Sequence, residues 1–304
     1  MRVHPVIEDA ATVVNVVAES MGQPLSLHSE LDVDVYRLHP SDAGPDARDL
    51  VARVFGPGVE RAMVDTAAHV LERLAGTRFP AERCMSDDPV LALGEDRHVL
   101  ITEYVEPSPA PGPGFLLAWC AGLLSRLAVR PANDLPAGGG WHRLGLTPSA
   151  EIYQALALGG HLGLSVAEVV DALADADDGA GLPEALVHAD LTPPNAVPRG
   201  EQPPVIIDWV GVGRGPRVWP LAFLLYVAGP AGARRALDRY TSSVPLSEEE
   251  RARLPAVMIA RPLTLDLWSA AYERMTARQV VTRFRAHRAR VEAIAAALND
   301  PDRA

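Results

Sequence analysis

Residues 106–114 read EPSPAPGPG, and this proline-rich segment constrains the fold more than any other feature of the sequence. Proline fixes φ and lacks an N–H donor, so the segment can form neither a helix interior nor a central strand. Before it, apolar residues occur in short, partly alternating runs that are typical of strands, and after it they recur at helical spacing. The sequence therefore predicts a boundary after Val105, between an N-terminal lobe of residues 1–105 and a C-terminal lobe of residues 106–304.

The two lobes are expected to differ in secondary structure. Short β-branched runs between turn residues predict strands in the first lobe, and apolar spacing of three and four residues predicts helices. The expected N-terminal elements are a helix at 8–22, strands at 25–31, 33–39 and 49–56, a helix at 59–76 and strands at 89–95 and 98–105. The expected C-terminal helices are 115–129, 149–163, 166–176, 219–229, 232–243, 247–275 and 277–300.

Composition and charge limit the possible partners. Apolar residues make up 48% of the 304 residues, which is typical of a globular protein, and no apolar run reaches the roughly 18–20 residues of a membrane helix. A formal net charge of -11 argues against nucleic acid as a partner, because phosphate binding needs clustered cations. Cys84 and Cys120 are far apart, which supports neither a disulfide framework nor a cysteine metal site. We expect a cytoplasmic protein that contacts neither membrane nor nucleic acid.

All 28 basic side chains are arginine, because the sequence contains no lysine. Any chemical step that ordinarily uses a lysine must therefore use arginine here. The guanidinium group binds phosphate oxygens in a planar, bidentate way, whereas an ammonium group acts as a point charge.

The stretch HADLTPPN carries the strongest chemical signal, with His188, Asp190 and Asn195 in the pattern HxDxxxxN. Pro193 and Pro194 forbid a continuing helix, so Asp190 and Asn195 are expected on a loop. The following PPVIIDW reads as a buried strand that ends near Asp208.

Oxygen donors at this spacing suit magnesium-dependent phosphoryl transfer, with Asp190 orienting or deprotonating an acceptor hydroxyl. Taken singly, Asp190 and Asn195 are more often turn residues, and Asp208 is more often a strand-end cap. His188 is expected to hold the loop by hydrogen bonds. A metal-dependent hydrolase built on His188, Asp190 and Asp208 would need further histidines.

The pattern HxDxxxxN followed by IIDW resembles the aminoglycoside phosphotransferase and choline kinase family, whose members are relatives of the protein kinases. The segments GLLSRLAVRP and DLVARVFGPG are similar to the family helix after the hinge and to its phosphate-binding strand. The resemblance implies an α+β, bilobal, protein-kinase-like fold, with an N-terminal antiparallel sheet lobe that binds the nucleotide. It also implies a larger, mainly helical C-terminal lobe that carries the catalytic residues and binds the substrate.

The resemblance also implies roles for single residues. Asp190 would be the catalytic base, Asn195 and Asp208 would hold Mg²⁺, and Arg53 would replace the phosphate-binding lysine. The segment ITEYVEP resembles the family hinge, which makes the backbones of Glu103 and Val105 candidates for contact with the adenine edge. They are otherwise ordinary strand residues. The implied activity is transfer of the γ-phosphate of ATP or GTP to a hydroxyl of a small molecule.

The chain departs from the family pattern at three places. The turn region 26–38, which would cover the phosphates, contains no glycine. No glutamate of the helix at 59–76 falls at the position expected to pair with the phosphate-binding cation. The segment 220–222 reads PLA where the family has DLA, so a carboxylate is missing. These losses keep a second function open, that of a catalytically degenerate kinase fold that binds a nucleotide or ligand.

The acceptor site is expected on helices after the metal loop. Asp266 and Glu273 lie seven residues apart, so both carboxylates share one helix face near Trp268. Carboxylates beside an aromatic ring suit an amine-bearing or sugar-like ligand, although a solvated acidic face gives the same pattern. An aminoglycoside or other antibiotic, an amino alcohol and a sugar-like metabolite all remain possible acceptors, and an antibiotic would imply a resistance function.

Overall fold

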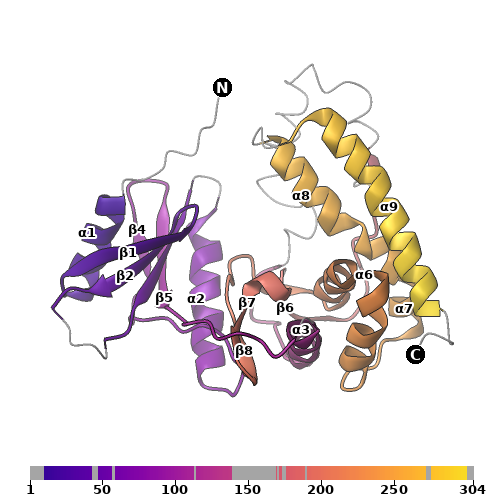
Figure 1. The fold of residues 1–304 in the computed structure, drawn as a ribbon, viewed down its shortest axis with the longest axis horizontal. Helices are drawn as coiled ribbons and strands as arrows, with labels where there is room; N and C mark the ends of the chain where they lie inside the picture. Colours follow the sequence, from indigo (N-terminus) through magenta and orange to yellow (C-terminus); the bar gives the residue numbers. More distant parts are fainter. Residues whose placement is uncertain are drawn as a thin grey trace. The chain divides into compact units, whose positions relative to one another are not determined.

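The computed structural model describes residues 10–42, 47–56, 59–112, 114–138, 169, 171–172, 176–188, 190–271 and 275–299. The chain divides into two compact units, Met1–Pro109 with Val197–Val210, and Ala110–Ala196 with Gly211–Ala304. We call them unit 1 and unit 2 and describe each by itself (Figure 1). The 14-residue return segment of unit 1 contains the candidate metal ligand Asp208.

Unit 1 is built on a five-stranded antiparallel sheet with the strand order β1-β2-β3-β5-β4 (Figure 1). Two helices accompany the sheet, and a hairpin of β7 and β8 comes from the return segment. The bounds are α1 Ala10–Met21, β1 Leu25–Asp32, β2 Val35–Pro40, β3 Leu50–Phe55, α2 Arg61–Ala75, β4 Val90–Ala92, β5 His98–Glu103, β7 Ala196–Arg199 and β8 Gln202–Ile206.

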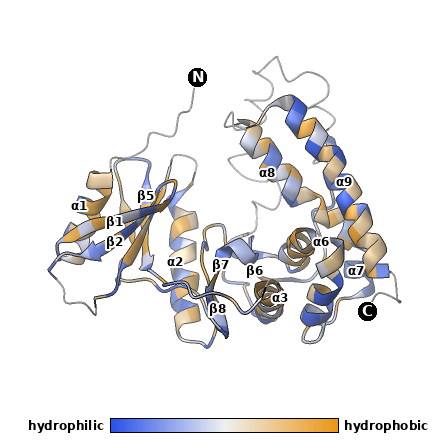
Figure 2. Cartoon of the chain, in the orientation of Figure 1, coloured by the Kyte–Doolittle hydropathy of each residue, from blue (hydrophilic) through white to orange (hydrophobic). Residues whose placement is uncertain are grey.

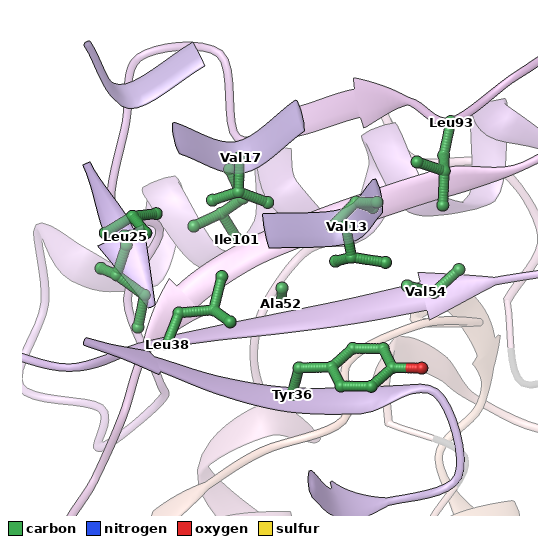
Figure 3. Packing of buried hydrophobic residues seen from close by; sticks show 11 residues of the cluster. Val13, Val17, Leu25, Tyr36, Leu38, Ala52, Val54, Leu93 and Ile101 are labelled. Atoms are coloured by element: carbon green, nitrogen blue, oxygen red, sulfur yellow. The ribbon is translucent and has the colours of Figure 1, made fainter. Parts of the chain in front are cut away.

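One face of this sheet forms a core with α1. Val13 and Val17 of α1 are fully buried against a cluster that includes Tyr36, Ala52 and Ile101 (Figure 3). Because side chains alternate along a strand, Arg53 points to the opposite face from Ala52. The alternation of β3 therefore places the arginine on the face that α1 does not cover.

Unit 2 is mainly helical. The helix α3 packs against α6, α6 also contacts α7 and α9, and a two-stranded sheet pairs β6 with β9. Figure 2 shows α3 as largely apolar, whereas α9 alternates apolar and polar residues. The bounds are α3 Phe115–Leu127, β6 Glu184–Val187, the short 3-10 turn Pro193–Asn195, β9 Gly213–Pro216, α6 Val218–Thr241, α7 Glu248–Met258, α8 Ala260–Ala271 and α9 Ala277–Asn299.

The predicted fold class is confirmed: an N-terminal antiparallel sheet with helices precedes a mainly helical region. The segment predicted as one helix at 247–275 is two helices, α7 and α8. Pro262 lies in the first turn of α8, where its missing N–H leaves no helical bond unmade. The predicted helix at 149–163 lies outside the described residues, as does most of the one at 166–176. The boundary after Val105 stays a prediction.

Helix α6 joins the two predicted helices at 219–229 and 232–243 across a break at Gly229, whose φ is 67°. Arg290 of α9 donates from Nε to the Tyr226 carbonyl at 2.9 Å and from Nη2 to the Val227 carbonyl at 3.1 Å. These bonds satisfy carbonyl groups that the break would leave without helical partners. None of the described helices is long and apolar enough to cross a membrane.

Candidate active site

The loop that follows β6 is organised by backbone hydrogen bonds around Asp190. His188 is 2% exposed, and its Nδ1 accepts the Asp190 N–H at 3.2 Å. The Asp190 carbonyl accepts the Asn195 Nδ2–H at 2.9 Å and the Thr192 N–H at 3.0 Å. Pro193 and Pro194 begin the short 3-10 turn that ends at Asn195, so the expected loop chemistry is the one observed. These bonds fix the loop without using the Asp190 carboxylate.

The Asp190 carboxylate itself is half-buried, with 30% of its side chain exposed. Its Oδ1 accepts a hydrogen bond from the buried Thr192 hydroxyl at 2.9 Å. Its Oδ2 lies 3.5 Å from Nη2 of Arg261, which comes from α8. The carboxylate is thus oriented by neighbours and still open to solvent, as a general base must be.

The contact between Arg261 and Asp190 was not predicted from the sequence. The side chain of Arg261 is only 9% exposed, and its guanidinium lies 5.6 Å from the centre of the Phe223 ring. A cation over an aromatic face is stabilised by the ring quadrupole. No local pattern near RPLTLDLW distinguishes this arginine from a helix-surface residue.

Unit 1 holds the other candidate residues. Arg53 Nη1 donates to Asp208 Oδ1 at 2.6 Å, and the two side chains are 14% and 42% exposed. Asp208 has a φ of 67°, a left-handed conformation that is strained for any residue other than glycine, asparagine or aspartate. The next residue, Trp209, is buried, and its Nε1 donates to the Ile206 carbonyl at 2.9 Å. This anchor helps to hold the turn that presents the Asp208 carboxylate.

Glu82 is a second residue of the site that the sequence did not reveal. The Ile206 N–H donates to the Pro80 carbonyl at 2.8 Å, and the Glu82 N–H donates to the Ile206 carbonyl at 3.0 Å. This backbone pairing brings Glu82, only 3% exposed, beneath the Asp208 turn. Its Oε1 accepts the Asp208 N–H at 2.9 Å, and its Oε2 accepts the Thr102 hydroxyl at 2.9 Å.

The surroundings of the Glu82 carboxyl act on its pKa in both directions. Burial raises the pKa of the Glu82 carboxyl above its usual range, although Arg53 and the two hydrogen bonds oppose that shift. Glu82 follows α2 in the sequence and is a buried carboxyl, so it is not the glutamate of α2 that the family resemblance leads us to expect. On α2 itself, Glu72 is exposed and Asp65 forms an ion pair with Arg61 at 3.4 Å.

Replacing Glu82 by alanine is expected to lower the free energy of unfolding by about 2 kcal/mol, because the buried Thr102 hydroxyl and the partly buried Asp208 N–H lose their acceptor. Glu82→Gln keeps an acceptor for the Asp208 N–H and should cost less than about 1 kcal/mol. Denaturant unfolding of both variants measures the difference. Glu72→Ala is the matched control, since an exposed change on α2 should stay within about 0.5 kcal/mol. If Glu82→Ala is as mild as the control, these bonds do not hold the Asp208 turn.

The two hinge candidates lie at and after the end of β5. The N–H of Glu103 donates to the Arg83 carbonyl at 2.8 Å, and the Tyr104 N–H donates to the Asp49 carbonyl at 2.9 Å. Because the N–H of Glu103 is already used, the carbonyl of Glu103 is the backbone group of this residue that could bind the adenine edge. Val105 is half-buried, two residues beyond the strand. Their contact with adenine stays a prediction.

The turn between β1 and β2 is acidic and partly apolar. Asp32 Oδ1 accepts the Val33 N–H at 2.7 Å, and Asp34 adopts a left-handed φ of 58°. Leu31 and Val33 are 45% and 55% exposed. An aspartate thus provides the backbone conformation that glycine often provides, and its carboxylate adds negative charge to this turn.

The predicted acceptor residues have different surroundings. Asp266 is 2% exposed and accepts bonds from Arg283 Nε at 2.8 Å and from His287 Nε2 at 2.7 Å. The His287 Nδ1 in turn lies 2.5 Å from the Tyr226 hydroxyl. Burial favours a higher pKa for Asp266, but the bonds from His287 and Arg283 prevail and hold it below its usual range. Glu273 and the side chain of Trp268 lie outside the described part of the chain.

Asn195 of unit 2 and Asp208 of unit 1 each carry an oxygen of the type that a hard cation such as Mg²⁺ prefers. The Asn195 side chain donates from Nδ2 to the Asp190 carbonyl, so this hydrogen bond does not use the Asn195 amide oxygen. The Asp208 carboxylate is 42% exposed, and amide and carboxylate oxygens are the ligands that Mg²⁺ prefers. Among the described residues between 10 and 299, no group of three or more His, Cys, Asp or Glu side chains could hold a metal. Mg²⁺ commonly uses one or two protein ligands with substrate phosphates and water.

Solved structures show how the fold is shared. An aminoglycoside phosphotransferase from Alicyclobacillus acidocaldarius matches with a TM-score of 0.59 and 18% identity, over 97% of this chain and 96% of that one. A choline kinase from Streptococcus pneumoniae matches with a TM-score of 0.59 and 16% identity, over 94% and 99%. An amicoumacin kinase, solved with AMP-PNP and Ca²⁺, matches with a TM-score of 0.61 and 13% identity, over 91% and 92%. At these identities the likeness establishes a shared kinase-like fold.

Sequence comparison identifies the family. No curated protein sequence matches the chain. The profile described as the phosphotransferase enzyme family matches residues 25–255, which is well over half of the chain and includes every candidate residue from Arg53 to Asp208. This protein belongs to the phosphotransferase enzyme family.

Proposed function

We propose that the protein transfers the γ-phosphate of ATP or GTP to a hydroxyl group of a small molecule in a magnesium-dependent reaction. Family membership and the kinase-like fold support a small-molecule phosphotransferase. The observation that carries the proposal furthest is the Asp190 loop. Its carboxylate is oriented by Thr192 and Arg261 yet partly exposed, as general-base chemistry requires.

In this proposal Asp190 accepts the proton of the acceptor hydroxyl while the hydroxyl oxygen attacks the γ-phosphorus. The bond between the γ-phosphorus and the β–γ bridging oxygen breaks, and ADP or GDP leaves. His188 is a positioning residue, because its buried ring holds the Asp190 backbone N–H. Asn195 and Asp208 would hold Mg²⁺, which supplies positive charge to neutralise the phosphate oxygens. Arg53 would bind phosphate oxygens in place of a lysine, and its hydrogen bond to Asp208 keeps its guanidinium oriented.

The proposed contacts with the adenine edge come from the resemblance to the family hinge. They are made by the carbonyl of Glu103 and the backbone of Val105. The AMP-PNP in the amicoumacin kinase structure supports a nucleotide donor for that protein, and by fold likeness for this one. We propose a cytoplasmic location, where nucleoside triphosphates are available, and no membrane or nucleic-acid partner.

The acceptor is a small molecule with a free hydroxyl, and Asp266, Trp268 and Glu273 stay candidates for contact with it. Both oxygens of Asp266 already take part in bonds to α9, so contact with an acceptor through this carboxylate would require those bonds to open. The acceptors considered from sequence are an aminoglycoside or other antibiotic, an amino alcohol and a sugar-like metabolite.

A specific observation favours a second function, a nucleotide- or ligand-binding protein without turnover. The β1–β2 turn has no glycine, and the carboxylates of Asp32 and Asp34 are unfavourable neighbours for a triphosphate. A nucleotide that binds without being turned over would support this alternative.

Binding of a nucleoside triphosphate together with Mg²⁺ tests the proposal directly. At millimolar ATP or GTP the melting temperature is expected to rise by a few degrees with Mg²⁺ and by less with EDTA, because ligand binding stabilises the folded state. Thermal denaturation measures this difference. If neither nucleotide changes the melting temperature at millimolar concentration with Mg²⁺, the proposed function is wrong.

A further inference from the structure

The carboxylate of Glu82 joins two segments of unit 1, one of which carries the candidate magnesium ligand Asp208. Glu82 is 3% exposed and lies between α2 and β4. Its Oε1 accepts the Asp208 N–H at 2.9 Å, and its Oε2 accepts the hydroxyl of the buried Thr102 at 2.9 Å. Both carboxylate oxygens are therefore bonded to protein donors, so Glu82 acts on the site through the groups that it holds.

These hydrogen bonds close a ring with Arg53. Val51 lies opposite Thr102 in the pairing of β3 with β5, and it precedes Arg53 by two residues. Opposed residues and residues two positions apart share a sheet face, so Thr102 and Arg53 lie on the same face. From that face Arg53 Nη1 donates to Asp208 Oδ1 at 2.6 Å. Thr102 is linked to the Asp208 backbone through Glu82. The ring thus holds the side chain of Asp208 from one side and its backbone from the other.

The backbone of Asp208 needs this support, because its φ of 67° lies in the left-handed region. That conformation is unfavourable for residues with a Cβ, although asparagine and aspartate tolerate it better than most. A hydrogen bond from the Asp208 N–H to a fixed, buried acceptor stabilises the conformation against its alternatives. The acceptor is fixed because the Glu82 N–H itself donates to the Ile206 carbonyl at 3.0 Å.

In the proposed function Asp208 exchanges its side-chain partner. Arg53 would turn from Asp208 Oδ1 to phosphate oxygens, and the Asp208 carboxylate would bind Mg²⁺ instead. The bond to Glu82 uses the Asp208 N–H and no side-chain atom of Asp208, so it persists through this exchange. Groups that orient a metal ligand without touching the metal typically change metal affinity by about 10- to 100-fold. Glu82 has the contact and the burial of such a group.

We infer that Glu82 is a positioning residue for the magnesium ligand Asp208: its side chain reaches the Asp208 N–H, holds the left-handed turn and thereby raises the affinity for Mg²⁺. The inference rests on the proposed function, since it takes Asp208 as a ligand of Mg²⁺. This role differs from that of the α2 glutamate expected from the family resemblance, which would pair with the phosphate-binding cation. Glu82 acts instead on the backbone of a metal ligand.

Two conservative variants separate the reach of this side chain from its charge. Glu82→Asp keeps the carboxylate but is one methylene shorter and should not reach the Asp208 N–H, whereas Glu82→Gln keeps the reach and an acceptor oxygen. Affinity for ATP or GTP is measured by calorimetric titration at a series of free Mg²⁺ concentrations, without acceptor. The Mg²⁺ concentration at half-maximal effect should rise about tenfold or more in Glu82→Asp and stay within about threefold in Glu82→Gln. In EDTA neither variant should bind the nucleotide more weakly than the wild type.

A double variant shows whether Glu82 acts through Asp208. Asp208→Asn alone is expected to abolish the effect of Mg²⁺, so adding Glu82→Asp to it should change nucleotide affinity no further if the two residues act as one unit. A purely structural role would lower the affinity by the same factor in both backgrounds. Glu72→Asp is the matched control, because it makes the same chemical change on the exposed surface of α2 and should keep the wild-type response to Mg²⁺.

The outcomes distinguish this inference from the proposed function. A wild-type response to Mg²⁺ in Glu82→Asp, a larger change in Glu82→Gln than in Glu82→Asp, or equal losses with and without Asp208→Asn overturns the inference and leaves the phosphotransferase function intact. If melting curves show that Glu82→Asp does not fold, Thr102→Val releases the second oxygen of Glu82 and should raise the required Mg²⁺ at least about twofold. An unchanged requirement in that variant then contradicts the inference. The proposed function fails, and the inference with it, if no nucleotide binds to the wild type with or without Mg²⁺.

Discussion

Replacing Asp190 by asparagine is expected to lower turnover by about 10²- to 10⁴-fold, because an amide cannot accept the proton of the acceptor hydroxyl. Binding of nucleotide with Mg²⁺ should change little. The bonds that hold the loop use the backbone N–H and carbonyl of Asp190, and an asparagine oxygen can still accept the Thr192 hydroxyl. Steady-state kinetics and calorimetric titration with nucleotide measure the two effects separately.

Two controls accompany this variant. Asp238→Asn makes the same chemical change on the exposed surface of α6 and should keep full turnover. The melting temperature of Asp190→Asn shows whether Arg261, which loses its charged neighbour, destabilises the loop. Wild-type turnover in Asp190→Asn would show that Asp190 is not the base.

Replacing Asp208 by asparagine is expected to abolish the effect of Mg²⁺ on nucleotide binding and to lower turnover by about 10³-fold or more. The physical reason is the loss of a charged oxygen ligand, since charge stabilisation by a metal is worth several kcal/mol in the transition state. Nucleotide binding without Mg²⁺ should not weaken, because removal of this carboxylate leaves Arg53 with more unbalanced positive charge for the phosphates. Titrations with ATP or GTP, with Mg²⁺ and with EDTA, measure both effects.

A matched control for this variant is Asp65→Asn on α2, whose carboxylate is half-exposed and pairs only weakly with Arg61 at 3.4 Å. It should keep the magnesium dependence of the wild type. The assignment of Asp208 is wrong if its asparagine variant binds nucleotide with the same Mg²⁺ dependence as the wild type. Melting curves of both variants separate this result from unfolding.

The periodicity of the sequence predicted a strand-rich N-terminal region, a helical C-terminal region and most elements, whereas the kinase-like fold class followed from the family resemblance. The alternation in LVARVF predicted a strand, and it also determined that Arg53 and Ala52 point to opposite faces. The continuous helical spacing of 247–275 did not show where α7 ends and α8 begins. Periodicity reports which residues face a core, whereas a helix end also depends on which backbone groups find partners in the fold.

The candidate site was predictable where its residues are close in sequence. The pattern from His188 to Asn195 determines a loop because its prolines and short polar side chains act on neighbouring backbone groups. Glu82 was not predictable, since it meets Asp208 from 126 residues away through the pairing of Pro80 and Glu82 with Ile206. Arg53 was found only through the family resemblance, and its pairing with Asp208 spans 155 residues.

The sequence by itself determined the order of strands and helices from α1 to β5, the loop that carries Asp190 and Asn195, and the chemical type of each candidate ligand. Only the tertiary structure decided which charges meet. It placed Glu82 beneath the Asp208 turn, Arg261 beside Asp190, and Arg283 and His287 on Asp266. The physical reason is that backbone preferences act between residues only a few positions apart in the sequence. Ion pairs and buried hydrogen bonds depend instead on distances in space, which are set only when the chain folds.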